Sequence, residues 1–216
     1  MLPTCSVDPL HTRTHGARMN TLTRIALLGD VASIRQGHPF RGAIAAVPEG
    51  PVQVIQLKNL ALDGLQERDH LLRTALRARK PPDWVQDQDV LIAGRGNHPL
   101  AMLLHNPPES TVCSPHLYVL RVCTPDLLPA FLAWQLNQRA AQAYLRQQAA
   151  GSRQQSLRKT AVAQLPVHVP PVAQQRRIVG IASAAQAEQR CLEALIHIRQ
   201  QEIAVVAEQV LQGSGA

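Results

Sequence analysis

Short apolar segments separated by turn residues characterise the chain from about residue 25 to residue 125. Apolar runs of this kind, bounded by Gly, Pro, Asn or Asp, are typical of β-strands. The pattern therefore predicts a mixed sheet in this part of the chain. Its expected strands are Ile25–Leu28, Val52–Leu57, Val90–Ala93, Met102–Leu104 and Leu117–Val122.

The spacing of apolar residues changes to a helical period after Pro129. Between Ala130 and Gln148 they recur at helical intervals, which predicts one amphipathic helix that ends before Gly151. A short extended segment, Leu165–Val169, follows it. Strands followed by helices in this order indicate the α+β class, a globular domain with a mixed β-sheet and flanking helices.

A long C-terminal helix is predicted after Pro171, because no Pro and only one internal Gly, Gly180, occur before Gly213. About 35 residues at ~1.5 Å each would reach roughly 50 Å, which is more than the domain needs for its own packing. Gln189 and Arg199 interrupt its apolar stripe, and such polar positions can set the register of paired helices. The stripe consists of Ile178, Ile181, Ala185, Leu192, Leu195, Ile196, Ile203, Val206 and Val210.

This stripe has two interpretations. We favour a coiled-coil seam with another chain, since the length and the polar interruptions suit an interface that sets register. The alternative is a terminal helix packed on its own domain. The chain is accordingly divided into a disordered extension (1–18), a globular domain (19–168) and the long helix (169–216).

The composition narrows the class of protein. The 216 residues have a mass of 23.6 kDa, which suits one domain with an appended element, and 45% of them are hydrophobic. Aromatic residues make up only 3%, so a protein that stacks single-stranded bases on aromatic rings is not expected. No apolar run reaches the ~18 residues of a membrane span, and no signal peptide is recognisable. We therefore expect a cytoplasmic protein that does not enter a membrane.

Basic residues exceed acidic ones and are mostly arginine. The net charge is +7, the isoelectric point is about 9.9, and only three of the 22 basic residues are Lys. The Arg fork suits phosphates and guanine edges, which favours a nucleic-acid partner, although GC-rich coding would also enrich Arg. No acid occurs between Asp126 and Glu188, whereas residues 166–216 carry four charges of each sign. The basic excess thus belongs to the globular part, one end of which should be positive.

No catalytic, cofactor or metal site is apparent in the sequence. The four Cys and nine His form no CxxC or HExxH pattern, and no GxSxG or Walker motif occurs. Asp83, Asp87 and Asp89 crowd one loop, but no lysine of a two-metal nuclease site lies nearby. Residues 106–109, Asn-Pro-Pro-Glu, resemble the Asn-Pro-Pro-aromatic tetrad of amino-group DNA methyltransferases. Because Glu replaces the aromatic residue and no Gly-rich cofactor loop precedes it, we interpret the segment as a hairpin turn.

Two loops carry side chains suited to contact DNA. Arg95 lies between two glycines and is followed by Asn97 and His98, and Arg and Asn can bond to guanine and adenine edges. The second loop, residues 151–159, combines long polar side chains with no acid. Its candidate residues are Arg153, Gln154, Gln155, Arg158 and Lys159. The alternatives are a plain turn with an exposed Arg for the first loop and a solvated loop for the second.

Several segments follow one another in the order found in a known family. They are Leu28–Gly37, Val54–Leu60, Asp89–Ile92, Gly151-Ser152 with Leu157, and Leu165–Val179, the last of which enters the long helix through Pro170-Pro171. Together these segments resemble the specificity subunits of type I restriction-modification systems. The resemblance covers roughly residues 25–212.

The resemblance implies a protein that is not an enzyme. In this family each target recognition domain reads one half of a bipartite double-stranded DNA site, and the long helices form an antiparallel coiled coil. The coil acts as a spacer and docks DNA adenine methyltransferase (modification) subunits, which a restriction subunit can join. Full-length members carry two recognition domains and two helices, whereas this chain shows one of each. We therefore expect a half-length form that is a homodimer through residues 172–212.

The expected DNA-binding residues rest on side-chain chemistry and placement, because recognition domains differ in the residues that contact bases. Besides the two loops, they include Arg35, Arg41, Lys58 and Asn59. We expect a protein of the bacterial cytoplasm that is associated with the nucleoid through DNA. A second class stays open, a non-catalytic assembly or regulatory partner of a methyltransferase that uses the helix and reads no DNA.

Overall fold

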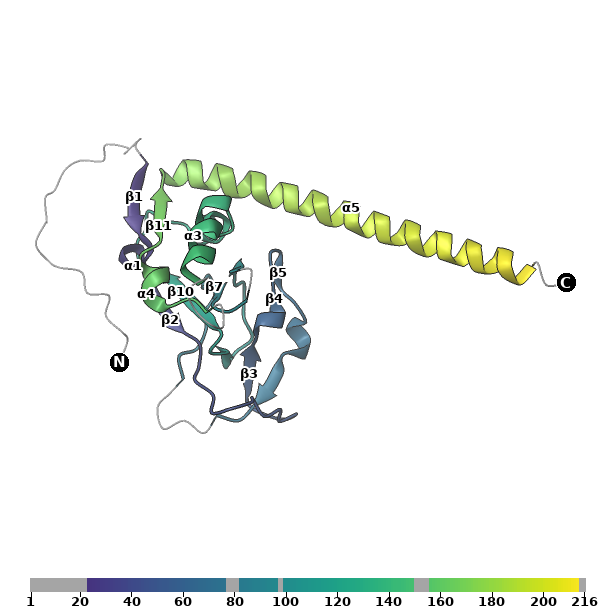
Figure 1. Ribbon diagram of the computed structural model, residues 1–216, viewed down its shortest axis with the longest axis horizontal. Coiled ribbons are helices and arrows are strands. Elements are labelled where there is room, and N and C mark those ends of the chain that lie inside the picture. The colour runs from purple at the N-terminus through teal and green to yellow at the C-terminus, as the bar shows by residue number, and fades with distance from the viewer. Residues whose placement is uncertain (1–22, 77–81, 97–98, 150–155, 214–216) are drawn as a thin grey trace, which may run out of the picture. The chain divides into compact units, whose positions relative to one another are not determined.

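A computed structural model describes residues 23–76, 82–96, 99–149 and 156–213 of the protein (Figure 1). The chain divides into two compact units, one up to Arg176 and one from Arg177. Several positions singled out in the sequence lie outside the described residues, namely the extension 1–18 and the candidate DNA contacts Asn97, His98, Arg153, Gln154 and Gln155.

The central sheet has four antiparallel strands in the order β2-β10-β7-β8. They are β2 (Ala32–Gln36), β10 (Leu117–Val122), β7 (Val90–Ala93) and β8 (Ala101–Leu103). Strands β7, β8 and β10 confirm three of the predicted strands, and every residue of β7 is buried, as its uninterrupted apolar sequence indicates. Strand β2 is not among the predicted strands, because Ser33, Arg35 and Gln36 interrupt its apolar positions.

A second sheet has the order β6-β3-β9. Strand β3 (Val52–Ile55) is antiparallel to β6 (Leu72–Thr74) and parallel to β9 (Thr111–Cys113). Buried apolar residues of both sheets, such as Ile55 and Leu91, belong to one core cluster. The predicted α+β class with a mixed sheet is therefore confirmed, although the strands are divided between two sheets that share a core.

A two-stranded ribbon joins the two ends of the domain. Strand β1 (Arg24–Leu27) pairs antiparallel with β11 (Pro166–Val169), so these segments lie side by side in Figure 1. The short helices α1 (Leu28–Val31) and α4 (Lys159–Ala163) are in contact next to the ribbon, and the Leu28 N–H donates to the Leu165 carbonyl at 2.9 Å. Both extended segments were expected from the sequence, but their pairing with each other is set by the tertiary fold.

The single helix predicted over Ala130–Gln148 is wrong, because two helices occupy this segment. They are α2 (Pro129–Leu136), which packs on β7 and β8, and α3 (Arg139–Ala149). The break lies at Asn137. Its Oδ1 accepts from the Ala101 N–H at 3.0 Å, and its Nδ2 donates to the Ala101 carbonyl at 2.7 Å. Both backbone groups of a strand residue are thus satisfied by the side chain at the break.

The connections between strands include one further correction. Residues 106–109 do not form a hairpin turn, because they join β8 of the central sheet to β9 of the second sheet. In this connection the backbone φ angle is positive at Asn106 (42°) and at Ser110 (53°). The Asp87 carboxylate accepts a hydrogen bond from the Asn106 N–H at 2.8 Å. That hydrogen bond lowers the pKa of Asp87. The other small elements are β4 (Leu60–Ala61), β5 (Gly64–Leu65), η1 (Leu57–Asn59) and η2 (Arg68–His70).

The long helix is α5 (Val172–Gly213), which has 42 residues and a length of about 63 Å at ~1.5 Å per residue. It begins directly after Pro170-Pro171. In its first turn the fully buried Gln175 accepts from the Leu128 N–H at 2.8 Å and donates to the carbonyls of Asp126 and Pro170, both at 2.6 Å. These three hydrogen bonds fix the start of the helix.

The second unit, which is α5 from Arg177 onward, leaves its large apolar side chains exposed. Residues 187–212 are all exposed, and the exposed fraction is 54% for Leu192, 57% for Ile196 and 69% for Ile203. Soluble proteins rarely leave a continuous apolar stripe of this kind in water. The helix of a single chain thus presents an apolar surface that a partner could cover.

Candidate nucleic-acid interface

The described ends of the two loops that the sequence singles out lie next to each other. Arg95 and Ser156 form an antiparallel bridge, and the Leu157 N–H donates to the Gly94 carbonyl at 2.9 Å. The hydroxyl of Tyr118, on strand β10, donates to the Leu157 carbonyl at 2.8 Å. Backbone pairing therefore brings the start of the first loop next to the end of the second.

The glycines that flank Arg95 have separate roles. A Cβ on Gly94 would lie 3.0 Å from the Tyr118 ring and 3.1 Å from the His116 carbonyl oxygen, so a larger residue would require these neighbours to shift by a few tenths of an ångström. Gly96 has a φ of 98°, which favours Gly. The lack of a side chain at Gly94 thus allows a close contact within the domain.

Exposed basic side chains lie on the helices next to this bridge. Arg158 and Lys159 are at the start of α4, and Arg139 and Arg146 are on α3. The Tyr144 hydroxyl of α3 donates to the Ala161 carbonyl of α4 at 3.3 Å, which ties the two helices together. None of these four basic residues forms an ion pair with a carboxylate of the described residues.

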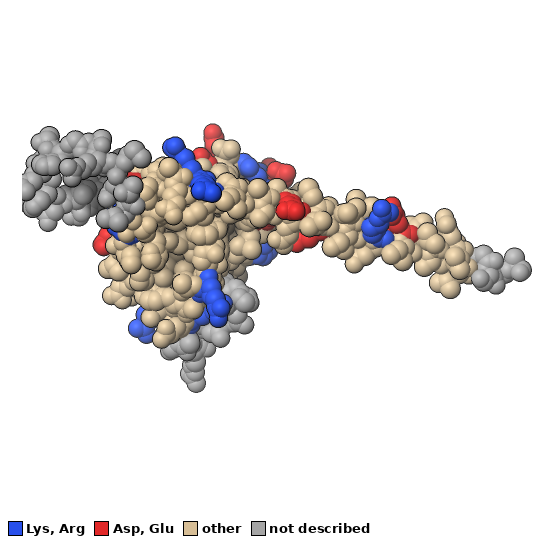
Figure 2. Space-filling view, turned by 90° about the horizontal axis from the view of Figure 1, so that it is seen from above, with Lys and Arg blue, Asp and Glu red and all other residues tan. Residues whose placement is uncertain are grey.

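The basic residues are spread over the surface. On the face that Figure 2 shows, Lys and Arg of the globular unit stand in separate clusters among uncharged residues, while α5 carries both signs.

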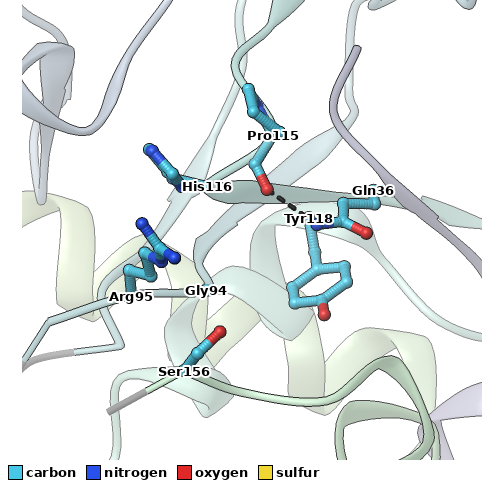
Figure 3. Close-up of a pocket in the computed structure, with 7 residues that line it drawn as sticks. All are labelled: Gln36, Gly94, Arg95, Pro115, His116, Tyr118 and Ser156. Carbon is cyan, nitrogen blue, oxygen red and sulfur yellow. Dashed lines mark hydrogen bonds between the residues drawn. The ribbon is translucent and has the colours of Figure 1, made fainter. Parts of the chain in front are cut away.

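A small cavity adjoins the bridge. It has a volume of about 210 Å³, and its lining includes Gln36, Arg95, His116, Tyr118 and Ser156 (Figure 3). The Gln36 side-chain amide donates to the Pro115 carbonyl at 2.9 Å, and the Gly94 N–H donates to the His116 carbonyl at 2.8 Å. Burial lowers the pKa of His116, and the positive charge of Arg95 lowers it further. Strands β2 and β10 and the segment that follows β7 therefore contribute to one polar cavity.

Of the other four predicted DNA contacts, three have partners within the chain. Arg35 forms an ion pair with Asp83 at 3.2 Å, and Lys58 forms one with Glu67 at 3.3 Å. Asn59 is buried, and its Oδ1 accepts from the Gln56 N–H at 2.9 Å. Arg41 is exposed in the connection that precedes β3. DNA contact by these four residues stays a prediction.

One ion pair was missed in the sequence. Asp89 is fully buried, and its two oxygens accept from Nε and Nη2 of Arg121 at 2.7 and 2.8 Å. The hydrogen bond to Asp89 raises the pKa of Arg121. The available signal was a charged residue inside the apolar segment 117–122, because a charge on a buried strand requires a partner. The pair stabilises the central sheet and takes Asp89 out of any catalytic role that needs solvent access.

The described residues offer little other chemistry. They contain no group of three or more His, Cys, Asp or Glu side chains that could hold a metal ion. Within the same ranges, no helix is both long and apolar enough to cross a membrane. Cys113, Cys123 and Cys191 are in no disulfide; Cys123 and Cys191 are exposed, and burial raises the pKa of the Cys113 thiol.

Comparisons with known proteins identify the fold. No family model and no curated protein matches the sequence. Among solved structures, a chain of a type I restriction-modification system, determined to explain complex assembly and conformational transition, has a TM-score of 0.56 at 18% identity, over 84% of this chain and 42% of that chain. The HsdS subunit from Thermoanaerobacter tengcongensis has a TM-score of 0.54 at 17% identity, over 85% and 41%. The specificity subunit from M. genitalium has a TM-score of 0.55 at 14% identity, over 84% and 44%.

These similarities first define a class, an α+β domain followed by a long helix. More closely, the described chain has the fold of the specificity subunits of type I restriction-modification systems, as the resemblance in sequence predicted. The chain spans about two fifths of the length of the structures it is similar to.

Proposed function

We propose that this chain is a sequence-specific double-stranded DNA recognition subunit of a type I restriction-modification system or a related DNA-methylation and phage-defence system. The observation that carries the proposal is the shared fold. The subunit is non-catalytic and acts in the bacterial cytoplasm at chromosomal DNA. It directs a DNA adenine methyltransferase subunit to a bipartite site, and a restriction subunit can join the complex.

The DNA-facing side of the domain, in this proposal, is the side of the Arg95–Ser156 bridge. Arg158 and Lys159 are exposed close to the bridge, and Asn97, Gln154 and Gln155 are near it in sequence. Arg and Lys would neutralise phosphates, and the amides would bond to base edges in the major groove. Affinity should therefore fall steeply with salt.

The assembly proposed for the helix is an antiparallel homodimer. Six of the nine stripe residues form pairs that are symmetric about Ala194, namely Ile178 with Val210, Ala185 with Ile203 and Leu192 with Ile196, and the polar positions Gln189 and Arg199 form a fourth such pair. An antiparallel pair centred there packs apolar against apolar and puts Gln189 beside the partner subunit's Arg199. A parallel pair in register would instead bring two Arg199 charges together, which is unfavourable. Closed twofold symmetry follows naturally from a self-complementary stripe.

The experiment that tests this function is methylome sequencing of the source organism with and without the chain. The expected result is loss of one bipartite adenine mark made of two inverted half-sites. Binding of the purified chain to DNA that carries the mark, compared with random DNA over a salt series, gives the direct measurement. An unchanged methylome together with no preference for that DNA would refute the proposal.

The second candidate is a non-catalytic assembly or regulatory partner of a methyltransferase that acts through α5 alone. The exposed apolar stripe of α5 is the observation that favours it. The two candidates differ in whether the globular domain binds DNA. Arg158→Ala and Lys159→Ala should weaken DNA binding if the chain reads DNA, and should leave methyltransferase activity unchanged if it acts through the helix alone.

A further inference from the structure

The cavity beside the Arg95–Ser156 bridge concentrates hydrogen-bond donors and positive charge. Arg95 offers a guanidinium, His116 an imidazole and Gln36 a side-chain amide, and Ser156 adds a hydroxyl. In Figure 3 the Arg95 and His116 side chains lie near each other on one side of the cavity. No Asp or Glu is among its described lining residues. The cavity is therefore built for an anion.

The size of the cavity restricts the anion. Its 210 Å³ is below the ~300–1,000 Å³ that is usual for sites of drug-sized ligands and cofactors. A whole nucleotide is too large for it, whereas one tetrahedral group is not. The cavity also lies against the bridge between the two loops proposed to face DNA.

We propose that this cavity is a phosphate subsite, in which Arg95, His116 and Gln36 hold one phosphate group. The guanidinium donates two parallel hydrogen bonds to phosphate oxygens, the geometry that Arg prefers. Gln36 donates the N–H that is not used by Pro115, and protonated His116 supplies a second positive charge. This inference rests on the proposed function for the source of the phosphate, which is the DNA backbone. A free phosphate ion has the same chemistry and is tested separately.

Occupation of the subsite should be linked to the protonation of His116. Burial and the charge of Arg95 both oppose the imidazolium, so the pKa of His116 is low while the cavity is empty. Tyr118, the other titratable group in the lining, has a pKa that burial raises, so it stays neutral. A phosphate that enters offsets the repulsion between Arg95 and His116, and it must therefore raise the pKa of His116. By linkage, phosphate binds more tightly as the pH falls.

This assignment gives Arg95 a different role from that of a base reader. A phosphate contact positions the protein on DNA and carries no sequence information, whereas a base contact discriminates at one position. Loss of a phosphate contact weakens binding to all sequences and reduces the slope of log K against log salt by about 1. Loss of a base contact relaxes one base pair.

The test uses the full chain with a labelled duplex that carries the methylation site and with a random duplex. Arg95→Ala and Gln36→Ala should weaken binding to both, with about a tenfold loss for Arg95→Ala, and the Arg95→Ala salt slope should fall by about 1. Affinity of the unmodified protein should rise between pH 7.5 and pH 5.5, and His116→Gln should remove most of that rise. Arg190→Ala and His197→Gln, exposed on α5, are the matched controls and should change neither property.

Inorganic phosphate is the second probe, with the His116 ring proton observed by NMR. Millimolar phosphate should raise the pKa of His116, and it should not do so in Arg95→Ala. If DNA binds but Arg95→Ala affects a single base pair and His116→Gln leaves the pH dependence intact, the subsite is overturned and the proposed function stands. If no DNA binds but phosphate still raises that pKa, the subsite stands as a free-phosphate site and the proposed function fails. If neither probe responds, both fail.

Discussion

At the scale of single residues, the fold brings together side chains that are far apart in the sequence. Arg95 was predicted as a candidate contact from its own loop, and the fold adds Gln36 from β2 and His116 from the turn before β10. Local sequence could not predict that cavity, because the antiparallel pairing of β10 with β2 and β7 decides which residues meet. The same limitation explains why the Asp89–Arg121 pair was missed.

Removal of Arg121 should destabilise the domain strongly. Asp89 has a side chain that is 1% exposed, and Arg121→Met would leave its charge without the partner that offsets burial. We expect a loss of about 3 kcal/mol in the free energy of unfolding, the lower end of what breaking a buried pair costs, because Arg121 is partly exposed. Urea denaturation gives the measurement. Lys58→Met removes the exposed pair with Glu67 and should cost at most about 1 kcal/mol. Equal losses for the two variants would contradict this account.

Low pH should reduce the stability of the domain, because it removes the charge of Asp126, which forms an ion pair with Arg24 of β1. Asp126 is partly buried, which raises its pKa, but hydrogen bonds from Thr124 and Arg24 and the charge of Arg24 outweigh this and lower it overall. A carboxyl group with a lowered pKa stabilises the fold above its ordinary value of 3.8 and loses that contribution as the pH falls below it. Arg24→Gln should therefore reduce the melting temperature more at pH 6 than at pH 2.5. A loss of the same size at both pH values would show that the charge is not the cause.

At the scale of elements, local pattern and tertiary contact explain different parts of the fold. The apolar runs predicted β7, β8 and β10, and the proline-free stretch predicted α5, because burial of these segments follows from their own composition. The break between α2 and α3 could not be predicted, since it depends on hydrogen bonds between Asn137 and Ala101 across 36 positions. The division of the strands into two sheets likewise depends on partners that are distant in sequence.

Gln175 should prove to be the anchor of α5. Gln175→Leu keeps similar bulk but removes three hydrogen bonds and leaves the Leu128 N–H without its acceptor, at a cost of about 1–3 kcal/mol. Hydrogen exchange should then be faster in the first turn of α5. The exposed neighbour Gln174 provides the control, because Gln174→Leu removes none of these bonds. Equal effects of the two variants would show that the anchor lies elsewhere.

At the scale of the whole molecule, the proposed dimer turns one chain into a reader of two inverted half-sites. The fold of the domain and the exposed stripe of α5 agree with what the sequence predicted. The pairing of chains is the part that neither the sequence pattern nor a single chain determines, so it needs a direct measurement.

Disulfide cross-linking can determine the direction and register of the helices. In a background with Cys5, Cys123 and Cys191 changed to Ser, Gln189→Cys mixed with Arg199→Cys should form a covalent dimer on oxidation, and each variant alone should not. In the antiparallel register two copies of position 189 are separated by about 15 Å along the helix axis, too far for a disulfide. Non-reducing electrophoresis gives the measurement. A dimer formed by Gln189→Cys alone would indicate parallel helices instead.

The β1–β11 ribbon has a consequence for how such a domain can be rearranged genetically. The polypeptide enters the domain through β1 and leaves it through β11 at one edge, since Arg24 is paired with Val169. Duplicated copies could therefore be concatenated without one chain threading through another. For the same reason, a circularly permuted domain, with Val169 tethered to Arg24 by a short linker, should keep its fold. Neighbouring ends make the domain a portable unit that can be cut and rejoined at this ribbon.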